Sequence, residues 1–448
     1  MNKIVDAVTA VLCHQGQILL VRRQPFLRAF SGYHAFPGGK VDPEDAQGAT
    51  PDARWHGFDP RIVRALLREI SEEVNLDLAA HPDWIKAVRH LGIALTPAPA
   101  PVRFNTHFFH VELDHCDTLT PDLHEISDCE WASAAQWGQR YEEGEVLLAP
   151  PTLHTLQALA ADANAISVPA LAHENRFPYE LPLLETLRGV RQILVRSHTL
   201  PPAQHTNCFL LGDAQTHRVL VDPSPADEDE LERLVAVVGR FGIHEIFITH
   251  HHADHHERAN VLARRLQVPI GMSADTQTRI RARQPHYFDE LTVNAYQQGD
   301  AVCRWQGHAV RVLEVPGHDE GQLALMPDNR AWCIVGDLIQ GIGTVVIAEP
   351  EGHMGRYYQS LEKIIALAPR AIFPSHGMAL GGTYRLSATL KHRQQREQQI
   401  LMLHQQGHDP DAMLPIIYAE VDPRLLPLAR MNILSHLHKL REEGVIHG

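Results

Sequence analysis

The sequence has few cysteines and no long uncharged apolar run. Its 448 residues include six cysteines, no two of which form a C-x-x-C pair. This spacing argues against a zinc knuckle or a disulfide frame, so we expect reduced, mostly buried thiols. The chain also lacks a run of about 18 uncharged apolar residues and a signal-peptide core. We therefore predict no membrane span and a cytoplasmic location.

Basic residues are scarce relative to acidic ones. Forty Lys and Arg side chains stand against 54 Asp and Glu, which gives a formal net charge of −14. This balance argues against a protein that coats nucleic acid, although it is compatible with a local basic patch. A chain of 448 residues is long enough for two or three domains, each with its own core.

Histidine, in contrast, is abundant, at 31 of 448 residues. Histidine is the commonest metal ligand and a proton carrier near neutral pH, so metal chemistry is the first hypothesis. The alternative is a histidine-rich surface without a chemical role.

Breaks in composition divide the chain. Pro150-Pro151 closes a mixed region, and residues 166–182 form a proline-bearing connector. Short apolar strands then alternate with helical patterns, which is an α/β layout, and from about residue 394 the pattern is helical. We predict a first domain at 1–165, a linker at 166–183, a second domain at 184–395 and a cap at 396–448.

A segment rich in metal ligands follows the apolar strand predicted at residues 246–249. It is Thr249-His250-His251-His252-Ala253-Asp254-His255. The H-x-H-x-D-H pattern assigns His250 and His252 to one metal, and Asp254 and His255 to a second. Because each catalytic zinc takes about three protein ligands plus water, further ligands must come from downstream.

Three downstream segments offer those ligands, and each comes after an apolar strand-like run. They are Pro316-Gly317-His318, Val335-Gly336-Asp337 and Pro374-Ser375-His376-Gly377. The C-terminal ends of strands are where α/β folds place their sites. Chance placement of histidines would hardly produce all four elements in this order.

The four segments resemble those of the metallo-β-lactamase-fold hydrolases, from about Leu184 to the end of the chain. The resemblance implies that two Zn ions (or Fe or Mn), about 3.5 to 4 Å apart, share a hydroxide that attacks a carbonyl carbon or a phosphorus, oriented by Asp254. The residues it assigns are His250, His252 and His318 for one metal, Asp254, His255 and His376 for the other, and Asp337 as the bridge. His251 and His256 have no ligand role in this pattern, so we expect them to support the ligands or face solvent. The other histidines are interpreted as a titratable surface.

The C-terminal helices, with Glu443-Gly444-Val445-Ile446 at their end, resemble the winged-helix cap of one branch of this family. That branch includes an endoribonuclease and thioesterases that act on carrier-bound acyl chains. Residues 401–448 hold more acids than Lys and Arg, which favours a packing and substrate-lid role over duplex binding. The branch with a large inserted nucleic-acid-processing domain is disfavoured, because Asp337 and His376 are too close in sequence.

Near the N-terminus, a glycine turn precedes a helix with three glutamates. The turn is Phe36-Pro37-Gly38-Gly39-Lys40, and the helical segment includes Arg68-Glu69-Ile70-Ser71-Glu72-Glu73. Glutamates at i, i+3 and i+4 share one helical face, where they could hold one hard cation such as Mg²⁺ or Mn²⁺. Without the glycine turn, the same three acids would be interpreted as a solvated helix surface.

This second constellation resembles the Nudix box, over about residues 3 to 160. Two departures stand out: Asp45 replaces the usual Glu, and 22 residues separate it from Arg68 where the family has seven. Asn75 replaces the family's Gly at the helix end and should still form a left-handed cap. The insertion and its flanking segments are similar to those of the coenzyme A diphosphatase branch.

The Nudix resemblance implies roles for the residues of both segments. Glu69, Glu72 and Glu73 would hold Mg or Mn, and Glu69 or Glu73 would help to deprotonate a water. Arg68 would orient the carboxylates, and the loop of Gly38, Gly39 and Lys40 would contact substrate phosphate.

The sequence therefore predicts a multidomain α/β and α+β hydrolase: a Nudix α/β/α sandwich, a metallo-β-lactamase αβ/βα sandwich and a small winged-helix cap. The expected substrate is a small molecule, such as an acyl-coenzyme A or a nucleotide-like compound, with no membrane partner. A thioesterase and a coenzyme A diphosphatase would act on the same compound class, an inference that rests on analogy between branches. Two alternatives are an endoribonuclease and a hydrolase whose Nudix domain only senses a nucleotide.

Overall fold

The computed structural model describes residues 4–48, 52–97, 103–172 and 180–447. The chain divides into two compact units, an N-terminal unit, Met1–Arg188, and a C-terminal unit, Gly189–Gly448. Residues 173–179, in the middle of the predicted linker, lie outside the described residues. Among the helices of the described part, none has the length and apolar character needed to cross a membrane.

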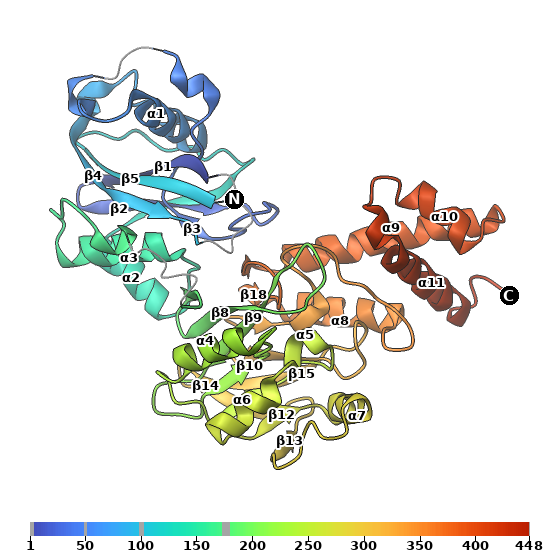
Figure 1. The fold of residues 1–448 in the computed structure, drawn as a ribbon. Helices are drawn as coiled ribbons and strands as arrows, with labels where there is room; N and C mark the ends of the chain where they lie inside the picture. Colours follow the sequence, from blue (N-terminus) through green and yellow to red (C-terminus); the bar gives the residue numbers. More distant parts are fainter. Residues whose placement is uncertain (1–3, 49–51, 98–102, 173–179, 448) are drawn as a thin grey trace. The chain divides into compact units, whose positions relative to one another are not determined.

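The N-terminal unit is built on a mixed sheet with helices on both faces (Figure 1). Its strands follow the order β3-β2-β1-β5-β4, with β6 paired to β2. The parallel pair of β1 and β5 runs in register from Ile4 opposite Arg103 to His14 opposite Leu113. The strands are β1 (Ile4–His14), β2 (Gln17–Arg23), β3 (His34–Ala35), β4 (Ile85–Leu95), β5 (Arg103–Leu113) and β6 (Ile126–Ala132).

Alternation along β1 explains why both faces of this sheet are covered. Val8, Ala10 and Leu12 pack with helix α1 in one buried cluster, whereas Val11 packs with α2 and α3 in another. Successive strand residues point to opposite faces, so β1 contributes to both cores. The helices are α1 (Pro60–Val74), α2 (Ala134–Glu142) and α3 (Pro150–Ala161).

Helix α1 carries the Nudix-like glutamates, and its ends are set by local sequence. Pro60 occupies the first turn, where its missing N–H costs nothing, and the Asp59 side chain accepts a hydrogen bond from the backbone N–H of Arg61. Asn75 ends the helix in the left-handed conformation, with φ 56° and ψ 40°. The cap predicted from the sequence is therefore confirmed.

The insertion between Asp45 and Arg68 is packed against the core. It follows the 3-10 helix η1 (Pro43–Ala46), and its described part includes the 3-10 helix η2 (Ala53–Trp55). Trp55 is buried, with its ring 6.1 Å from that of Phe109. The Arg64 side chain donates a 2.7 Å hydrogen bond to the backbone oxygen of Asp45, which ties α1 to the start of the insertion.

The described part of the predicted linker also contributes to the N-terminal unit. Val168 donates its backbone N–H to the oxygen of Leu91 at 2.7 Å. Val168 and Leu171 are buried in the cluster that contains α2 and α3. The remaining short elements are η3 (Pro82–Trp84), η4 (Pro169–Ala172) and β7 (Leu183–Leu187).

The C-terminal unit contains two sheets that face each other. One has the order β13-β12-β11-β10-β9-β8, and the other has the order β14-β15-β16-β17-β18-β19. Phe209 of β9 and Phe373 of β18 meet edge to face between them, with ring centroids 5.8 Å apart. The strands are β8 (Val190–Arg196), β9 (His205–Leu211), β10 (Val219–Val221), β11 (Glu245–Phe247), β12 (Ile270–Met272), β13 (Val293–Ala295), β14 (Ala301–Trp305), β15 (His308–Glu314), β16 (Leu323–Pro327), β17 (Cys333–Ile334), β18 (Ala371–Phe373) and β19 (Leu380–Gly381).

Helices cover this sandwich, and short helical turns follow several strands. Helix α8 packs its buried side, including Tyr357 and Leu361, against the sheet that contains β15 to β18. The helical elements up to this point are α4 (Glu228–Val238), α5 (Ala253–His256), α6 (Ala259–Leu266), α7 (Ala274–Arg283), η5 (Gly336–Leu338) and α8 (Met354–Leu367).

The apolar runs predicted as strands fall on β10, β11, β15, β17 and β18. Two neighbouring pairs, β10 with β11 and β17 with β18, are parallel. Parallel neighbours present their C-terminal ends at the same edge of a sheet, so the segments that follow them converge. This topology collects the ligand-rich segments at one end of the sandwich.

The C-terminal part of the chain is helical, as predicted. It consists of α9 (Tyr384–Gln405), α10 (Pro410–Ile417), η6 (Pro423–Leu425) and α11 (Leu426–Glu442), and no strand is assigned between 384 and 447. Ile400, Met413, Ile433 and Leu437 form a small core among these helices. The six cysteines are unpaired, three of them buried and three half-buried.

Candidate metal centre

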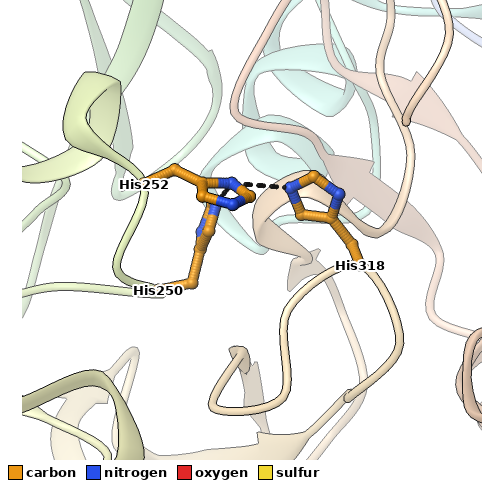
Figure 2. A group of neighbouring side chains, drawn as sticks. All are labelled: His250, His252 and His318. Carbon is orange, nitrogen blue, oxygen red and sulfur yellow. Dashed lines mark hydrogen bonds between the residues drawn. The ribbon is translucent and has the colours of Figure 1, made fainter. Parts of the chain in front are cut away.

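Three histidines from two loops point their ring nitrogens at one another (Figure 2). Nδ1 of His252 lies 3.0 Å from Nε2 of His250 and 2.9 Å from Nε2 of His318. His250 and His252 follow β11, and His318 follows β15. The structure thus brings together the first predicted ligand triad, with one nitrogen of each ring facing a common point.

A second group lies beside the first. Nε2 of His376 is 3.5 Å from Oδ2 of Asp254, and Nε2 of His255 is 3.8 Å from the same oxygen. Asp254 and His255 are on α5, and His376 follows β18. These are the three residues predicted for the second metal, and their ligand atoms are close enough to share an ion.

Asp337 lies between the two groups. Its Oδ1 is 3.4 Å from Nε2 of His376 and 3.7 Å from Nε2 of His255, whereas its Oδ2 is 3.8 Å from Nε2 of His318. One carboxylate oxygen thus faces each triad. Gln340 donates a 3.2 Å hydrogen bond to Oδ2 and fixes the orientation of this side chain.

The opposite ring nitrogens of these histidines have partners that fix the ring orientations. Nδ1 of His318 lies 2.8 Å from the oxygen of Val346, and Nδ1 of His376 lies 2.9 Å from the oxygen of His205. With Nδ1–H donating to these oxygens, Nε2 keeps a lone pair that faces the centre.

Asp222 contacts the ligand histidine His255 from behind, and no role was predicted for its side chain. Its Oδ2 lies 2.9 Å from Nδ1 of His255 and accepts a hydrogen bond from Thr249 Oγ1, and its Oδ1 accepts one from the Thr249 N–H. Asp222 follows β10 directly and adopts a positive φ of 49°. Asp222 comes directly after a predicted strand, and this position was the one sequence feature that could have indicated its role.

Several polar atoms of the centre are buried without a hydrogen-bond partner. They are Nε2 of His255, Nε2 of His376 and Oδ1 of Asp337. Buried polar atoms are nearly always paired, so three unpaired ligand-type atoms that face one point call for a cation. The set of imidazole nitrogens and carboxylates is one that Zn²⁺ and similar divalent metals bind. These residues therefore fit the metal pair that the fold implies.

The electrostatics differ between the two groups. Burial and the neighbouring His252 lower the pKa of His318 to about 4, and burial and the neighbouring His255 lower the pKa of His250 well below its usual value. Burial also opposes a charge on His376, but Asp337 and Asp254 outweigh it and raise the pKa of His376 to about 10. The carboxylates thus make the second position attractive to positive charge, whether a proton or a metal.

The remaining histidines are not all on the surface, which corrects the sequence interpretation. His110, His251, His256 and His436 are buried. Some of them contact residues far away in the sequence, as Nδ1 of His436 does with Oε2 of Glu397 at 3.1 Å. No local sequence pattern predicts that such histidines are buried. His251 and His256, expected to support the ligands or face solvent, are both inside the protein.

In the N-terminal unit, Arg68 lies among the acids of the Nudix-like segment. Its Nε and Nη2 donate to the two oxygens of Asp45, at 3.1 and 2.9 Å, and Nη1 donates to Glu69 and Glu72 at 2.9 Å each. Nη2 also donates to the backbone oxygen of Lys40 at 3.0 Å. Asp45, which the resemblance sets in the place of the usual Glu, thus receives a bidentate pair of hydrogen bonds from Nε and Nη2.

Glu73 faces the glycine turn instead. Gly38 donates its backbone N–H to Oε2 of Glu73 at 2.9 Å. Burial raises the pKa of Glu73 to about 8, although Gly38 and Arg23 act against the shift. A Cβ atom at Gly39 would meet the Glu69 carboxylate, so a larger residue there would displace the end of the Glu69 side chain.

The three glutamates share helix α1, but their oxygens do not converge. Among the described residues, no group of ligand atoms close enough for one ion includes Glu69, Glu72 or Glu73. Arg68 holds Glu69 and Glu72, and Glu72 is 59% exposed at its side chain. The predicted magnesium site would need these side chains to rearrange around the ion.

Three family models match the chain in sequence. The metallo-beta-lactamase superfamily matches residues 201–376, the NUDIX domain matches residues 3–148, and the beta-lactamase associated winged helix domain matches residues 410–447. The predicted fusion and its mixed α/β fold class are confirmed. Membership in the coenzyme A diphosphatase branch stays a prediction.

Related proteins cover the metallo-beta-lactamase part. The beta-lactamase-like protein 2 homolog of Drosophila melanogaster is 30% identical over 263 residues, which is 54% of this chain and 84% of the relative. The atrochrysone carboxyl ACP thioesterase of Aspergillus aculeatus is 21% identical over 240 residues, 52% of this chain and 70% of the relative.

Solved structures of other proteins are similar in fold, and one of them illustrates the extent of the likeness. The beta-lactamase domain protein from Burkholderia ambifaria has a TM-score of 0.50 at 23% identity, covering 60% of this chain and 91% of that chain. At this identity, the likeness shows the fold alone.

Proposed function

The chain belongs to the metallo-beta-lactamase superfamily, carries a NUDIX domain and is a hydrolase, and from this premise we propose that it cleaves thioesters with two divalent ions bound in Gly189–Gly448. The observation that carries the proposal is Asp337, with one oxygen 3.4 Å from His376 and the other 3.8 Å from His318. The name of the thioesterase relative supports the substrate class.

Two triads would hold the ions, with Asp337 shared between them. The first is His250, His252 and His318, and the second is Asp254, His255 and His376. When bound, two such ions lower the pKa of water and polarise an acyl carbonyl, which is the chemistry that ester and thioester hydrolysis needs. Zinc is our preferred metal because imidazole dominates the ligand set, and Fe or Mn are alternatives.

The chain's own residues supply positioning. His255 and His376 have no exposed side-chain surface, whereas the side chain of Asp254 is 18% exposed. Asp254 is therefore the member of the second triad that can accept a hydrogen bond from an incoming water and orient it toward the substrate. Gln340 orients Asp337, and Asp222 orients His255, so groups that would hold the ions are fixed in position by their neighbours.

For the N-terminal unit, we propose Mg-dependent hydrolysis of a nucleoside diphosphate-linked compound such as coenzyme A. Glu69, Glu72 and Glu73 would rearrange to hold the ion, and Glu69 or Glu73 would accept the proton of the attacking water. Arg68 would orient the carboxylates, and Gly38, Gly39 and Lys40 would contact phosphate. The raised pKa of Glu73, about 8, suits a general base that works near neutral pH.

A second candidate for this unit is a Nudix domain that binds a nucleotide without cleaving it. The observation in its favour is Arg68, which already donates hydrogen bonds of 2.9 to 3.1 Å to Asp45, Glu69 and Glu72. A metal must displace these bonds. The sensing alternative predicts that Glu72→Gln leaves nucleotide affinity unchanged.

Thiol release tests the thioesterase proposal. Full-length protein with Zn²⁺ and Mg²⁺ is incubated with a panel of acyl-coenzyme A and other acyl thioesters, and free thiol is measured. We expect turnover that Asp254→Asn abolishes and that Glu73→Gln leaves unchanged. RNA cleavage without thiol release, lost in Asp254→Ala, would replace the thioesterase with a nuclease.

Release of 3′,5′-ADP from the same substrates tests the Nudix proposal separately. We expect Glu73→Gln to abolish this product and Asp254→Asn to leave it unchanged. Nucleotide binding without product, in wild-type protein with Mg²⁺ or Mn²⁺, would favour the sensing alternative.

A further inference from the structure

His252 differs from the other histidines of its triad in what its second ring nitrogen contacts. Nδ1 of His250 lies 3.0 Å from the Thr249 hydroxyl, and Nδ1 of His318 lies 2.8 Å from a backbone oxygen. Nε2 of His252 instead lies 3.3 Å from Oε2 of Glu351. The His252 side chain is also the most open of the three, at 26% exposed, against 8% for His318 and none for His250.

Glu351 is held in place by two further groups. Its Oε1 lies 3.3 Å from Nε2 of His251, and it also accepts a hydrogen bond from Arg283 at the end of α7. Oε1 of Glu351 therefore contacts His251 and Arg283, whereas Oε2 contacts His252. A carboxylate with both oxygens engaged has little freedom to turn away from His252.

His251 is anchored on its other side. Its Nδ1 contacts Oδ2 of Asp319, and both side chains are fully buried. Oδ1 of Asp319 accepts the Gly321 N–H at 2.8 Å. Since Asp319 directly follows His318, this contact joins the loop of His250 and His252 to the loop of His318.

The segment that carries Glu351 is fixed at both ends. Ile347 donates its N–H to Oδ1 of Asn432 at 3.0 Å, and His353 donates its N–H to the oxygen of Gly317 at 2.8 Å. Arg393 of α9 also donates to the backbone oxygen of Val345. Helices of the C-terminal cap therefore hold the start of this segment.

We infer that Glu351 is a positioning residue for His252, and that Asp319, His251 and Arg283 hold Glu351 for this purpose. By accepting the Nε2–H of His252, Glu351 selects the tautomer in which Nδ1 has a free lone pair toward His250 and His318. A carboxylate partner also makes the imidazole a stronger metal ligand. The inference deepens the proposed function, because it rests on the same metal centre.

Metal affinity of the full-length protein tests this inference without reference to any substrate. Zn²⁺ binding constants are measured by competition with a chelating dye for wild type, Glu351→Ala and Glu351→Gln. We expect Glu351→Ala to weaken one of two Zn²⁺ constants by roughly 10- to 100-fold and to leave the other unchanged. Glu351→Gln, which keeps an acceptor but no charge, should lose less.

The matched control is Glu349→Ala, two residues away, whose carboxylate faces His438 at 3.1 Å. It should keep both Zn²⁺ constants. Long-range proton–nitrogen NMR of the metal-free protein gives a second readout: His252 should be the Nε2–H tautomer in wild type and a mixture in Glu351→Ala, at an unchanged thermal midpoint.

Unchanged Zn²⁺ constants in Glu351→Ala, or an equal loss in Glu349→Ala, would overturn the inference and leave the metal centre intact. Failure of the wild-type protein to bind two ions would instead overturn the proposed function, and the inference with it.

Discussion

Hydrogen-bond partners decide which nitrogen each histidine of the centre presents. Asp222 contacts Nδ1 of His255, and backbone oxygens contact Nδ1 of His318 and His376, so all three direct Nε2 inward. His252 is the exception, presenting Nδ1 because Glu351 contacts its Nε2. The centre thus depends on acceptors behind each ring as much as on the ligands.

Ionisation of Glu73 should make stability depend on pH in the absence of divalent metals. Burial raises its pKa from 4.5 to about 8 in the folded state. The folded state therefore favours the protonated acid, and this contribution is complete below pH 4.5 and is lost as the pH rises toward 8. At pH 7, the loss amounts to about 3 kcal/mol of unfolding free energy.

Urea unfolding of the full chain between pH 5 and 8, with chelator present, measures this effect. Glu73→Gln cannot ionise and should lack this part of the pH dependence. Glu72→Gln, at a side chain that is 59% exposed, serves as the control and should follow wild type. Parallel curves for wild type and Glu73→Gln would show that another group titrates.

At the scale of elements, the insertion before α1 acts as part of the core. Trp55 is 4% exposed and packs with Phe58 and Phe109 in the cluster that α1 covers. Trp55→Ala should therefore cost about 3 to 5 kcal/mol, as expected for a buried tryptophan. The measurement is the urea midpoint of the N-terminal unit's transition, with the neighbouring Arg54→Ala as control; a loss below about 1 kcal/mol would mean that the insertion is dispensable.

The order of strands and ligand-rich segments indicated that His318, Asp337 and His376 join the loop of His250 to His255, and the resemblance to the metallo-β-lactamase fold divided these residues between two metals. Each of His318, Asp337 and His376 comes soon after a short apolar strand, and parallel strands end at one edge. Glu351 could not be found this way, because it contacts His252 across 99 positions and follows no strand. Contacts between residues so far apart in the sequence depend on the folded topology, and no periodic sequence pattern predicts them.

In the Nudix-like helix, too, the sequence pattern predicted the positions of the residues but not their side-chain contacts. Spacing correctly placed Glu69, Glu72 and Glu73 on one helix, with Asn75 as its left-handed cap. The directions of these side chains depend on partners outside the helix. Arg68 donates a hydrogen bond to Asp45, and Glu73 accepts one from the Gly38 N–H. Neither contact can be predicted from the helical periodicity of the sequence.

At the scale of the whole C-terminal unit, helices α9 and α11 contact the segment that supports the candidate metal centre. Arg393 is buried and donates to Val345 and to Asn432, and Asn432 accepts from Ile347. The oxygen of Val346, between these two residues, is the partner of His318. These contacts agree with a packing role for the cap.

Arg393→Met should loosen this segment. Removing the guanidinium leaves the buried oxygen of Val345 without its donor, at a cost of about 1 to 3 kcal/mol. We expect faster amide hydrogen exchange at residues 342–353 and lower stability. Arg424→Met, at a side chain that is 88% exposed, should change neither; unchanged exchange in Arg393→Met would contradict the coupling.

Counting bound metals tests whether the two triads form a two-metal centre. Full-length protein is equilibrated with Zn²⁺, dialysed, and analysed by mass spectrometry for metal per chain, alongside His318→Ala and His376→Ala. We expect two tightly bound ions in wild type, fewer in each variant, and two in the control His286→Gln, whose histidine side chain is 90% exposed. Wild-type protein without two bound ions, or unchanged binding in both alanine variants, would contradict the two-metal centre.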